Sequence, residues 1–168
     1  MERLFYVLKI ENRLHCVCFT GHRPEKLDRS GAEIAKDLET EIRKAITDKM
    51  NVFISGMARG TDIMAAQIVL NLRAQNPQIK LVCACPYFGF ENDWSSDWQA
   101  QYRSVLKTAD VVKYVCKNYS RDCFQKRNEW MVNHSARVIA VFNGKGGGTK
   151  NTIAFKKKSG VPVVLIDG

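Results

Sequence analysis

The sequence has 168 residues, of which 45% are hydrophobic and 26% are charged, so it suits one folded domain and excludes a disordered or fibrous chain. The formal net charge of +9 favours an anionic partner such as a nucleotide, a nucleic acid or an acidic surface. No apolar run approaches the roughly 20 residues of a membrane span, and the N-terminus is a poor secretory signal. We therefore expect one cytoplasmic domain over 1–168, without a membrane partner.

Short apolar runs alternate with helical patterns along the chain. Six runs carry apolar or β-branched residues at successive positions, as in strands buried on both faces of a parallel sheet. They are His15–Thr20, Val52–Ser55, Lys80–Cys85, Val111–Val115, Val138–Phe142 and Pro162–Ile166. The helical patterns are Ile34–Ile46, Asp62–Arg73, Gln99–Lys107, Phe124–His134 and Thr149–Lys158. Residues 1–12 could add a short edge strand. This alternation predicts an α/β domain with a mainly parallel sheet.

Ligands of such folds bind at the carboxyl ends of the strands, so the loop after the first strand is a candidate site. Thr20 and Gly21 begin this loop, and glycine lets backbone amides approach a ligand closely. His22 and Arg23 offer donors suited to a phosphate or a ribose. The alternative interpretation is a polar turn with an exposed arginine.

The junction after the second strand contains Ser55, Gly56, Gly60, Thr61 and Asp62. It matches neither the dinucleotide G-x-G-x-x-G pattern nor a P-loop, but the free amides and dipole of the following helix could hold an anion. The aspartate would repel a phosphate, so it is a candidate for holding a ribose hydroxyl or for acid–base catalysis. A plain helix cap is the alternative.

A third junction follows the fifth strand, where Gly146, Gly147 and Gly148 precede Thr149 at a predicted helix start. Ordering three successive glycines is entropically costly, and a bare connection does not need them. We therefore favour phosphate binding at this junction over a flexible loop.

Two further segments could complete a site. Pro86 and Tyr87 open an aromatic loop with Glu91 in it, which could stack on a base or close a pocket, or could form a small satellite core. The run 127–129 lies early in a predicted helix and could reach the strand ends, or could form a salt-bridged surface. Its residues are Arg127, Asn128 and Glu129.

The six cysteines indicate a reducing cytoplasm rather than a disulfide framework. Cys16 and Cys18, like Cys83 and Cys85, lie in the middle of apolar strands, whereas zinc ligands favour C-x₂₋₄-C loops. We expect buried free thiols there and no metal site.

Five motifs in order resemble the YpsA-type branch of the SLOG superfamily, from about Cys18 to the end of the chain. They are TGHRPEKL, ISGMARGTDIMAA, CPYFGFENDWSSDWQAQYRSVLKTAD, RNEWMVNHSARVIAVFNG and GGGTKNTIAFKKKSGVPVVLID. The superfamily also contains the DNA-processing protein DprA (Smf) and the LOG enzymes. The resemblance implies a Rossmann-like three-layer fold that binds nucleotides, nucleotide-sugars or ADP-ribose-like ligands through the three loops. LOG-type hydrolases carry P-G-G-x-G-T-x-x-E, but Thr152 stands at the position of that glutamate here.

The leading hypothesis is therefore binding or sensing of an ADP-ribose- or NAD-like nucleotide, with no cofactor required. The alternative is an enzyme acting on an N-glycosidic bond, a nucleotide phosphoribohydrolase or deoxyribosyltransferase, with Asp62, Glu91 or Glu129 as the candidate catalytic carboxylate. Single-stranded DNA binding ranks third, because the aromatic loop is acidic. Since proteins of this fold often pair through helices, we expect a homo-oligomer.

Overall fold

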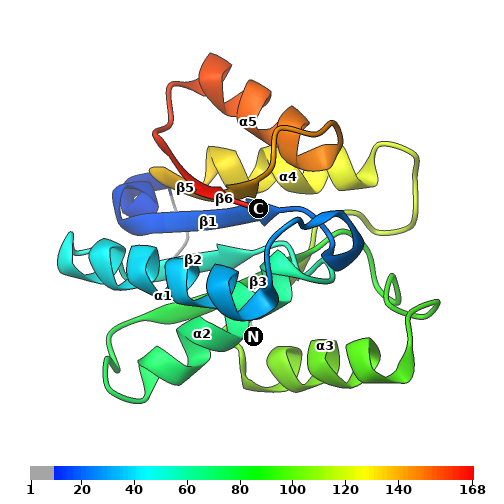
Figure 1. Ribbon diagram of the computed structural model, residues 1–168, viewed down its shortest axis with the longest axis horizontal. Coiled ribbons are helices and arrows are strands. Elements are labelled where there is room, and N and C mark those ends of the chain that lie inside the picture. Colours follow the sequence, from blue (N-terminus) through cyan, green and yellow to red (C-terminus); the bar gives the residue numbers. More distant parts are fainter. Residues whose placement is uncertain (1–9) are drawn as a thin grey trace.

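One parallel sheet organises the protein, whose computed structural model describes residues 10–168 (Figure 1). All six strands run parallel, in the spatial order β4-β3-β2-β1-β5-β6. Their bounds are β1 Cys16–Gly21, β2 Val52–Ser55, β3 Lys80–Cys85, β4 Val111–Tyr114, β5 Arg137–Phe142 and β6 Val163–Asp167. The chain winds outward from β1 to β4 and then returns to the other side of β1. The topological switch therefore lies between β1 and β5, where open α/β sheets bind ligands.

Helices cover both faces of the sheet and give the three layers (Figure 1). Helices α1, α2 and α3 pack on one face, and α4 and α5 on the other. The helix bounds are α1 Gly31–Thr47, α2 Thr61–Arg73, α3 Ser96–Thr108, α4 Cys123–Asn133 and α5 Gly148–Ser159, with short 3-10 helices η1 Ile10–His15 and η2 Pro24–Lys26. The predicted α/β class and parallel sheet are confirmed.

Helix α1 shows how local sequence sets an element. The side chain of Ser30 accepts a hydrogen bond from the backbone N–H of Glu33, whose carboxylate accepts one from the backbone of Ser30. This capping box starts the helix. Ile34, Leu38 and Ile42 then recur at i, i+4 and are fully buried, and Ile46, the last residue of the predicted pattern Ile34–Ile46, is partly buried against the same core.

The observed boundaries differ from the predicted ones mainly near the N-terminus of the chain and at the first residues of some elements. The possible edge strand over 1–12 lies largely outside the described residues, and its last part belongs to η1 instead. The first strand accordingly begins at Cys16, and α3 begins at Ser96, three residues before the predicted start. Within 10–168, none of the helices is long and apolar enough for a membrane crossing.

The strand cysteines divide between the two cores. Cys16 and Cys18 face α4 and α5, whereas Cys83 and Cys85 face α1, α2 and α3. All four are buried and lie outside the disulfide, and the two pairs lie on opposite faces of the sheet, so they cannot share a ligand.

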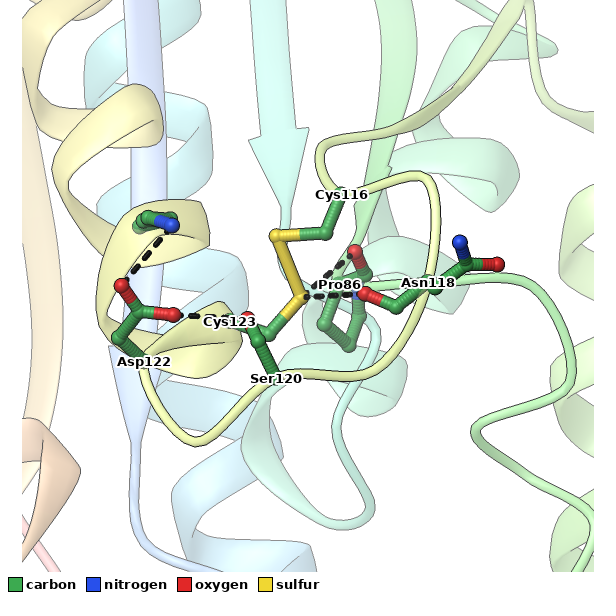
Figure 2. Close-up of a disulfide and its surroundings, with 7 residues drawn as sticks. Pro86, Cys116, Asn118, Ser120, Asp122 and Cys123 are labelled. Carbon is green, nitrogen blue, oxygen red and sulfur yellow. Dashed lines mark hydrogen bonds and ion pairs between the residues drawn. A yellow bond between two sulfur atoms is a disulfide. The ribbon is translucent and has the colours of Figure 1, made fainter.

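The prediction of cysteines without a disulfide was wrong for one pair. Cys116, just after β4, and Cys123, the first residue of α4, form a disulfide (Figure 2). Their Cα atoms lie 6.2 Å apart, within the range that a disulfide spans. The intervening loop turns the chain from the edge of the sheet back onto its face, and sequence spacing alone does not reveal that turn.

Candidate functional site

A cavity of about 330 Å³ opens at the carboxyl end of β1, at the topological switch. Its walls come from β1 and the loop after it, η2, the loop before α2, and the first turns of α4 and α5. Ten of the residues predicted from sequence line it: Thr20, Gly21, His22, Arg23, Asp62, Arg127, Asn128, Gly147, Gly148 and Thr149. The fold thus brings three predicted loops to one site.

The N-terminus of α5 forms one wall of the cavity. Gly147 precedes the helix with a φ of 134°, a conformation that favours glycine, and supplies no side-chain cap to the first turn. A side chain at Gly147 would point toward Lys26 Nζ, 3.6 Å away, so a lysine stands beside the helix start. Uncapped amides, the helix dipole and an ammonium group together suit a phosphate.

Three other glycines of the predicted site, Gly21, Gly56 and Gly60, admit neighbouring protein groups rather than a ligand. A Cβ atom at Gly21 would collide with the side chain of Thr61, and one at Gly60 would lie 2.8 Å from Pro24 Cδ. At Gly56 it would meet Arg127 Nη1 at 2.8 Å and Asp62 Oδ2 at 2.9 Å. These positions hold the loops together, whereas a Cβ atom at Gly147 or Gly148, at the start of α5, would come no closer than 3.6 Å to a neighbouring group.

Asp62 fills the second junction with its own carboxylate. The side chain is buried, and Oδ2 accepts a hydrogen bond of 3.2 Å from the backbone N–H of Ala58. Oδ1 has no hydrogen-bond partner within the described part of the chain. Burial raises the pKa of Asp62 to about 6, against the opposing effects of Arg127, the Ala58 hydrogen bond and Arg23. A carboxyl with this pKa can donate or accept a proton near neutral pH.

Arg127 is buried beneath the cavity rather than on a salt-bridged surface. Its Nη1 donates to the carbonyl oxygen of Gly56, and its Nε donates to Asn128 Oδ1 at 2.7 Å. Burial lowers the pKa of the guanidinium, and the carboxylate of Asp62 opposes this shift. The arginine therefore fixes the loop after β2 and supplies a positive charge next to Asp62.

His22 brings a second buried polar atom without a partner. Only 4% of the residue is exposed, its ring stacks on Phe142 with centroids 5.4 Å apart, and Nε2 has no hydrogen-bond partner among residues 10–168. Burial lowers the pKa of the imidazole, as do the charges of Lys26 and Lys145. Neutral His22 and protonatable Asp62 therefore both present unused hydrogen-bonding capacity in the cavity wall.

Several predicted site residues lie elsewhere. Those outside the cavity lining are Ser55, Gly56, Gly60, Thr61, Pro86, Tyr87, Glu91, Glu129 and Gly146. Ser55 supports the site, because its Oγ donates to the backbone oxygen of Asp62 at 2.8 Å. Glu129 accepts a hydrogen bond from Gln125, and Glu91 lies 3.9 Å from the Nε of Arg103.

The aromatic loop packs on itself. The ring of Tyr87 makes edge contacts with Phe90, Tyr119 and Phe124. Phe90 belongs to the main core, and Tyr87 and Phe124 pack against it. The loop therefore packs as core, as in the alternative interpretation, but as part of the main core rather than as a satellite. Thr152, at the position of the LOG glutamate, is also buried and donates to the backbone oxygen of Gly148 at 2.9 Å.

Sequence reasoning missed five lining residues: Phe19, Glu25, Lys26, Ala58 and Phe124. Lys26 carried a usable signal, because it is a cation in the loop already singled out after the first strand. Phe124 carried none, since an apolar residue in a helix is normally read as core. It is nevertheless the aromatic side chain that α4 contributes to the cavity.

Comparison with known proteins identifies relatives. The YpsA family, described as the YspA SLOG family, matches residues 17–161. The SPbeta prophage-derived protein YoqJ of Bacillus subtilis is 34% identical over 119 residues, which cover 64% of this chain and 70% of YoqJ. A UPF0398 protein of Bacillus cereus is 29% identical over 154 residues, covering 86% of this chain and 83% of that protein.

Solved structures share the fold at low sequence identity. DNA processing protein A of Helicobacter pylori, solved for its single-stranded DNA binding mode, has a TM-score of 0.65 at 16% identity, covering 95% of this chain and 69% of that one. The Streptococcus pneumoniae DprA has a TM-score of 0.62 at 18% identity, covering 94% and 52%. TM1055 has a TM-score of 0.56 at 16% identity, covering 92% and 75%. At these identities the likeness establishes the Rossmann-like fold alone.

Proposed function

We propose that this protein, which belongs to the YpsA family of SLOG proteins, binds a nucleotide-derived ligand in the cavity at the end of β1. The observation that carries the proposal is the pairing of two features in one cavity. An uncapped helix start lies beside a lysine, and two buried side chains, His22 and Asp62, have unpartnered polar atoms. Buried polar atoms without partners are rare, and a ligand with hydroxyl groups would satisfy these two.

The phosphate, the ribose and the base of a nucleotide would each lie against a different part of the cavity wall. The phosphate would lie against the first turn of α5, with Lys26 beside it. A ribose hydroxyl would donate to Asp62 and a second would reach His22. Phe124 offers a face on which the base can stack. This orientation keeps the phosphate away from the carboxylate of Asp62.

The first prediction concerns the phosphate end. Calorimetry should detect binding of at least one of AMP, ADP-ribose and NAD, and Lys26→Ala should weaken it about fivefold, the effect of losing one exposed charge contact of about 1 kcal/mol. The loss should shrink at high salt, since exposed charges are screened. Lys36→Ala is the matched control, because Lys36 is exposed on α1 and does not line the cavity. The proposal fails if none of the three nucleotides binds at millimolar concentration.

Asp62 favours a second candidate function, hydrolysis or transfer at an N-glycosidic bond. Its pKa of about 6 and its unpartnered Oδ1 suit a group that exchanges a proton with water or with a leaving base. Neither Glu91 nor Glu129 lines the cavity, which leaves Asp62 and the exposed Glu25 as its carboxylates.

The prediction for this activity is release of free base from a nucleotide, followed by chromatography. Asp62→Asn should lower the rate at least about 100-fold, the usual contribution of a positioned acid–base group. Glu129→Gln should leave the rate unchanged and serves as the control. Nucleotides that stay intact after prolonged incubation with the wild-type protein would exclude catalysis. Single-stranded DNA binding, the property named for the Helicobacter pylori protein, stays a third prediction for this chain.

A further inference from the structure

We propose that Cys116 and Cys123 are a reversible redox pair that controls the order of the first turns of α4 and, through them, one wall of the cavity. The disulfide joins the edge of the sheet to the first residue of α4 (Figure 2). Phe124, Arg127 and Asn128 follow within the next two turns and line the cavity. The redox state of one bond therefore acts on the segment that positions three lining side chains.

The disulfide is a covalent anchor at the start of α4. Asp122 is the N-cap residue, but it makes no side-chain capping hydrogen bond. Non-covalent contacts hold both ends of the loop as well: the backbone N–H of Cys116 donates to the Pro86 oxygen at 2.8 Å, and that of Cys123 donates to the Ser120 oxygen at 3.1 Å. An uncapped helix end frays readily, so a covalent link at its first residue adds order there.

The structure also provides for the reduced state. Cys123 Sγ lies 3.3 Å from the backbone oxygen of Pro86 and 3.8 Å from that of Asn118 (Figure 2). In the disulfide this sulfur carries no proton, so it cannot donate to either oxygen. Once reduced, the Cys123 thiol can donate to them without leaving its buried position. Both redox states therefore have local partners, as a reversible pair requires.

Solvent access and thiolate stability determine which sulfur of the disulfide a reductant attacks and which sulfur leaves. Cys116 is half-buried beside exposed residues 117–119, whereas Cys123 is buried. A thiolate of a dithiol reductant attacks Cys116 Sγ, the disulfide bond breaks, and its electron pair leaves on Cys123 at the positive end of α4. The second thiol of the reductant then displaces Cys116. The reductant departs as a cyclic disulfide, and each cysteine takes up one proton.

The four remaining cysteines are poor competitors for this chemistry. All are buried in the strands, and burial raises the pKa of Cys16 to about 11, that of Cys18 to about 12 and that of Cys85 to about 11. The pKa of Cys83 is also raised well above its ordinary value by burial. Thiols that stay protonated and enclosed do not exchange readily, so reoxidation rejoins Cys116 and Cys123 rather than forming another disulfide.

The test compares oxidised and dithiothreitol-reduced protein by mass spectrometry and hydrogen–deuterium exchange. Intact mass should rise by two hydrogens on reduction, and the α4 amides of 126–128 should exchange at least about fivefold faster. Cys116→Ser is the matched variant: it should exchange like reduced wild type and should not respond to dithiothreitol. Cys123→Ser repeats the test with the buried partner removed. Equal α4 exchange in oxidised and reduced wild type, or an equal response in Cys116→Ser, overturns the inference.

The effect on affinity rests on the proposed function, but the effect on α4 does not. Calorimetry with AMP and ADP-ribose should show binding about three- to tenfold weaker in the reduced protein. If α4 exchange changes while neither nucleotide binds in either state, the redox pair stands and the proposed nucleotide binding fails. If a nucleotide binds equally in both states and α4 exchange is unchanged, the redox inference fails and the binding function stands.

Discussion

Replacing Arg127 with methionine should lower the free energy of unfolding by about 3 kcal/mol, the usual cost of breaking a buried charge arrangement from one side. The change removes the guanidinium near the buried carboxylate of Asp62 and leaves the carbonyl oxygen of Gly56 without its donor. Methionine keeps much of the side-chain volume, so the cavity term is small. Urea denaturation at pH 7 measures the loss.

Two further variants make this result interpretable. Arg43→Met removes an exposed arginine that pairs with Glu39 across one turn of α1, and it should cost no more than about 0.5 kcal/mol. The double variant Asp62→Asn/Arg127→Met should recover much of the loss, because no charge remains buried. A loss from Arg127→Met no larger than that from Arg43→Met would show that the buried arginine does not compensate Asp62.

The second large effect is a stability that depends on pH through Asp62. The folded-state pKa of about 6 lies above the ordinary value of 3.8, so the folded protein holds the Asp62 proton more tightly than the unfolded chain does. The resulting stabilisation is fully present below pH 3.8 and is lost as the pH rises through about 6. Two pKa units correspond to about 3 kcal/mol.

The variant Asp62→Asn isolates the pH-dependent contribution of Asp62 to the free energy of unfolding. His22 opposes it in wild type, because its lowered pKa makes stability rise with pH below about 6.5, but both proteins share that effect. The wild-type minus Asp62→Asn difference in unfolding free energy, measured in urea from pH 4 to 7.5, should therefore fall with pH and level off above pH 6. A difference that does not change with pH would contradict the assignment.

The fold was largely predictable because its signals are local. The apolar strands and the buried stripe Ile34, Leu38, Ile42 depend on residues close in the sequence. The predicted boundaries were off by a few residues where the chain enters 3-10 geometry, as at η1. Such ends depend on tertiary contacts that a periodic pattern does not contain.

The site was predictable only in outline. The sequence indicated which loops matter, but the roles of Gly21, Gly56 and Gly60 follow from side chains that reach them from other segments. A glycine that leaves space for the side chain of Thr61 or Arg127 looks the same in the sequence as one that leaves space for a phosphate. The burial of Arg127 and the disulfide between Cys116 and Cys123 were hidden for the same reason, since each depends on where α4 begins in space.

Because β1 lies in the middle of the sheet, its position also determines at which stage of chain synthesis the cavity can form. Val17 of β1 pairs with Arg137 of β5, and the cavity wall at Thr149 comes later still, so its two halves are far apart in the chain. Contacts of such long sequence separation form late and slowly. A growing chain can assemble the β4-β3-β2-β1 half of the sheet on the ribosome, but the cavity is complete only after α5 has emerged. A bound nucleotide would therefore stabilise finished molecules and give no help to folding intermediates.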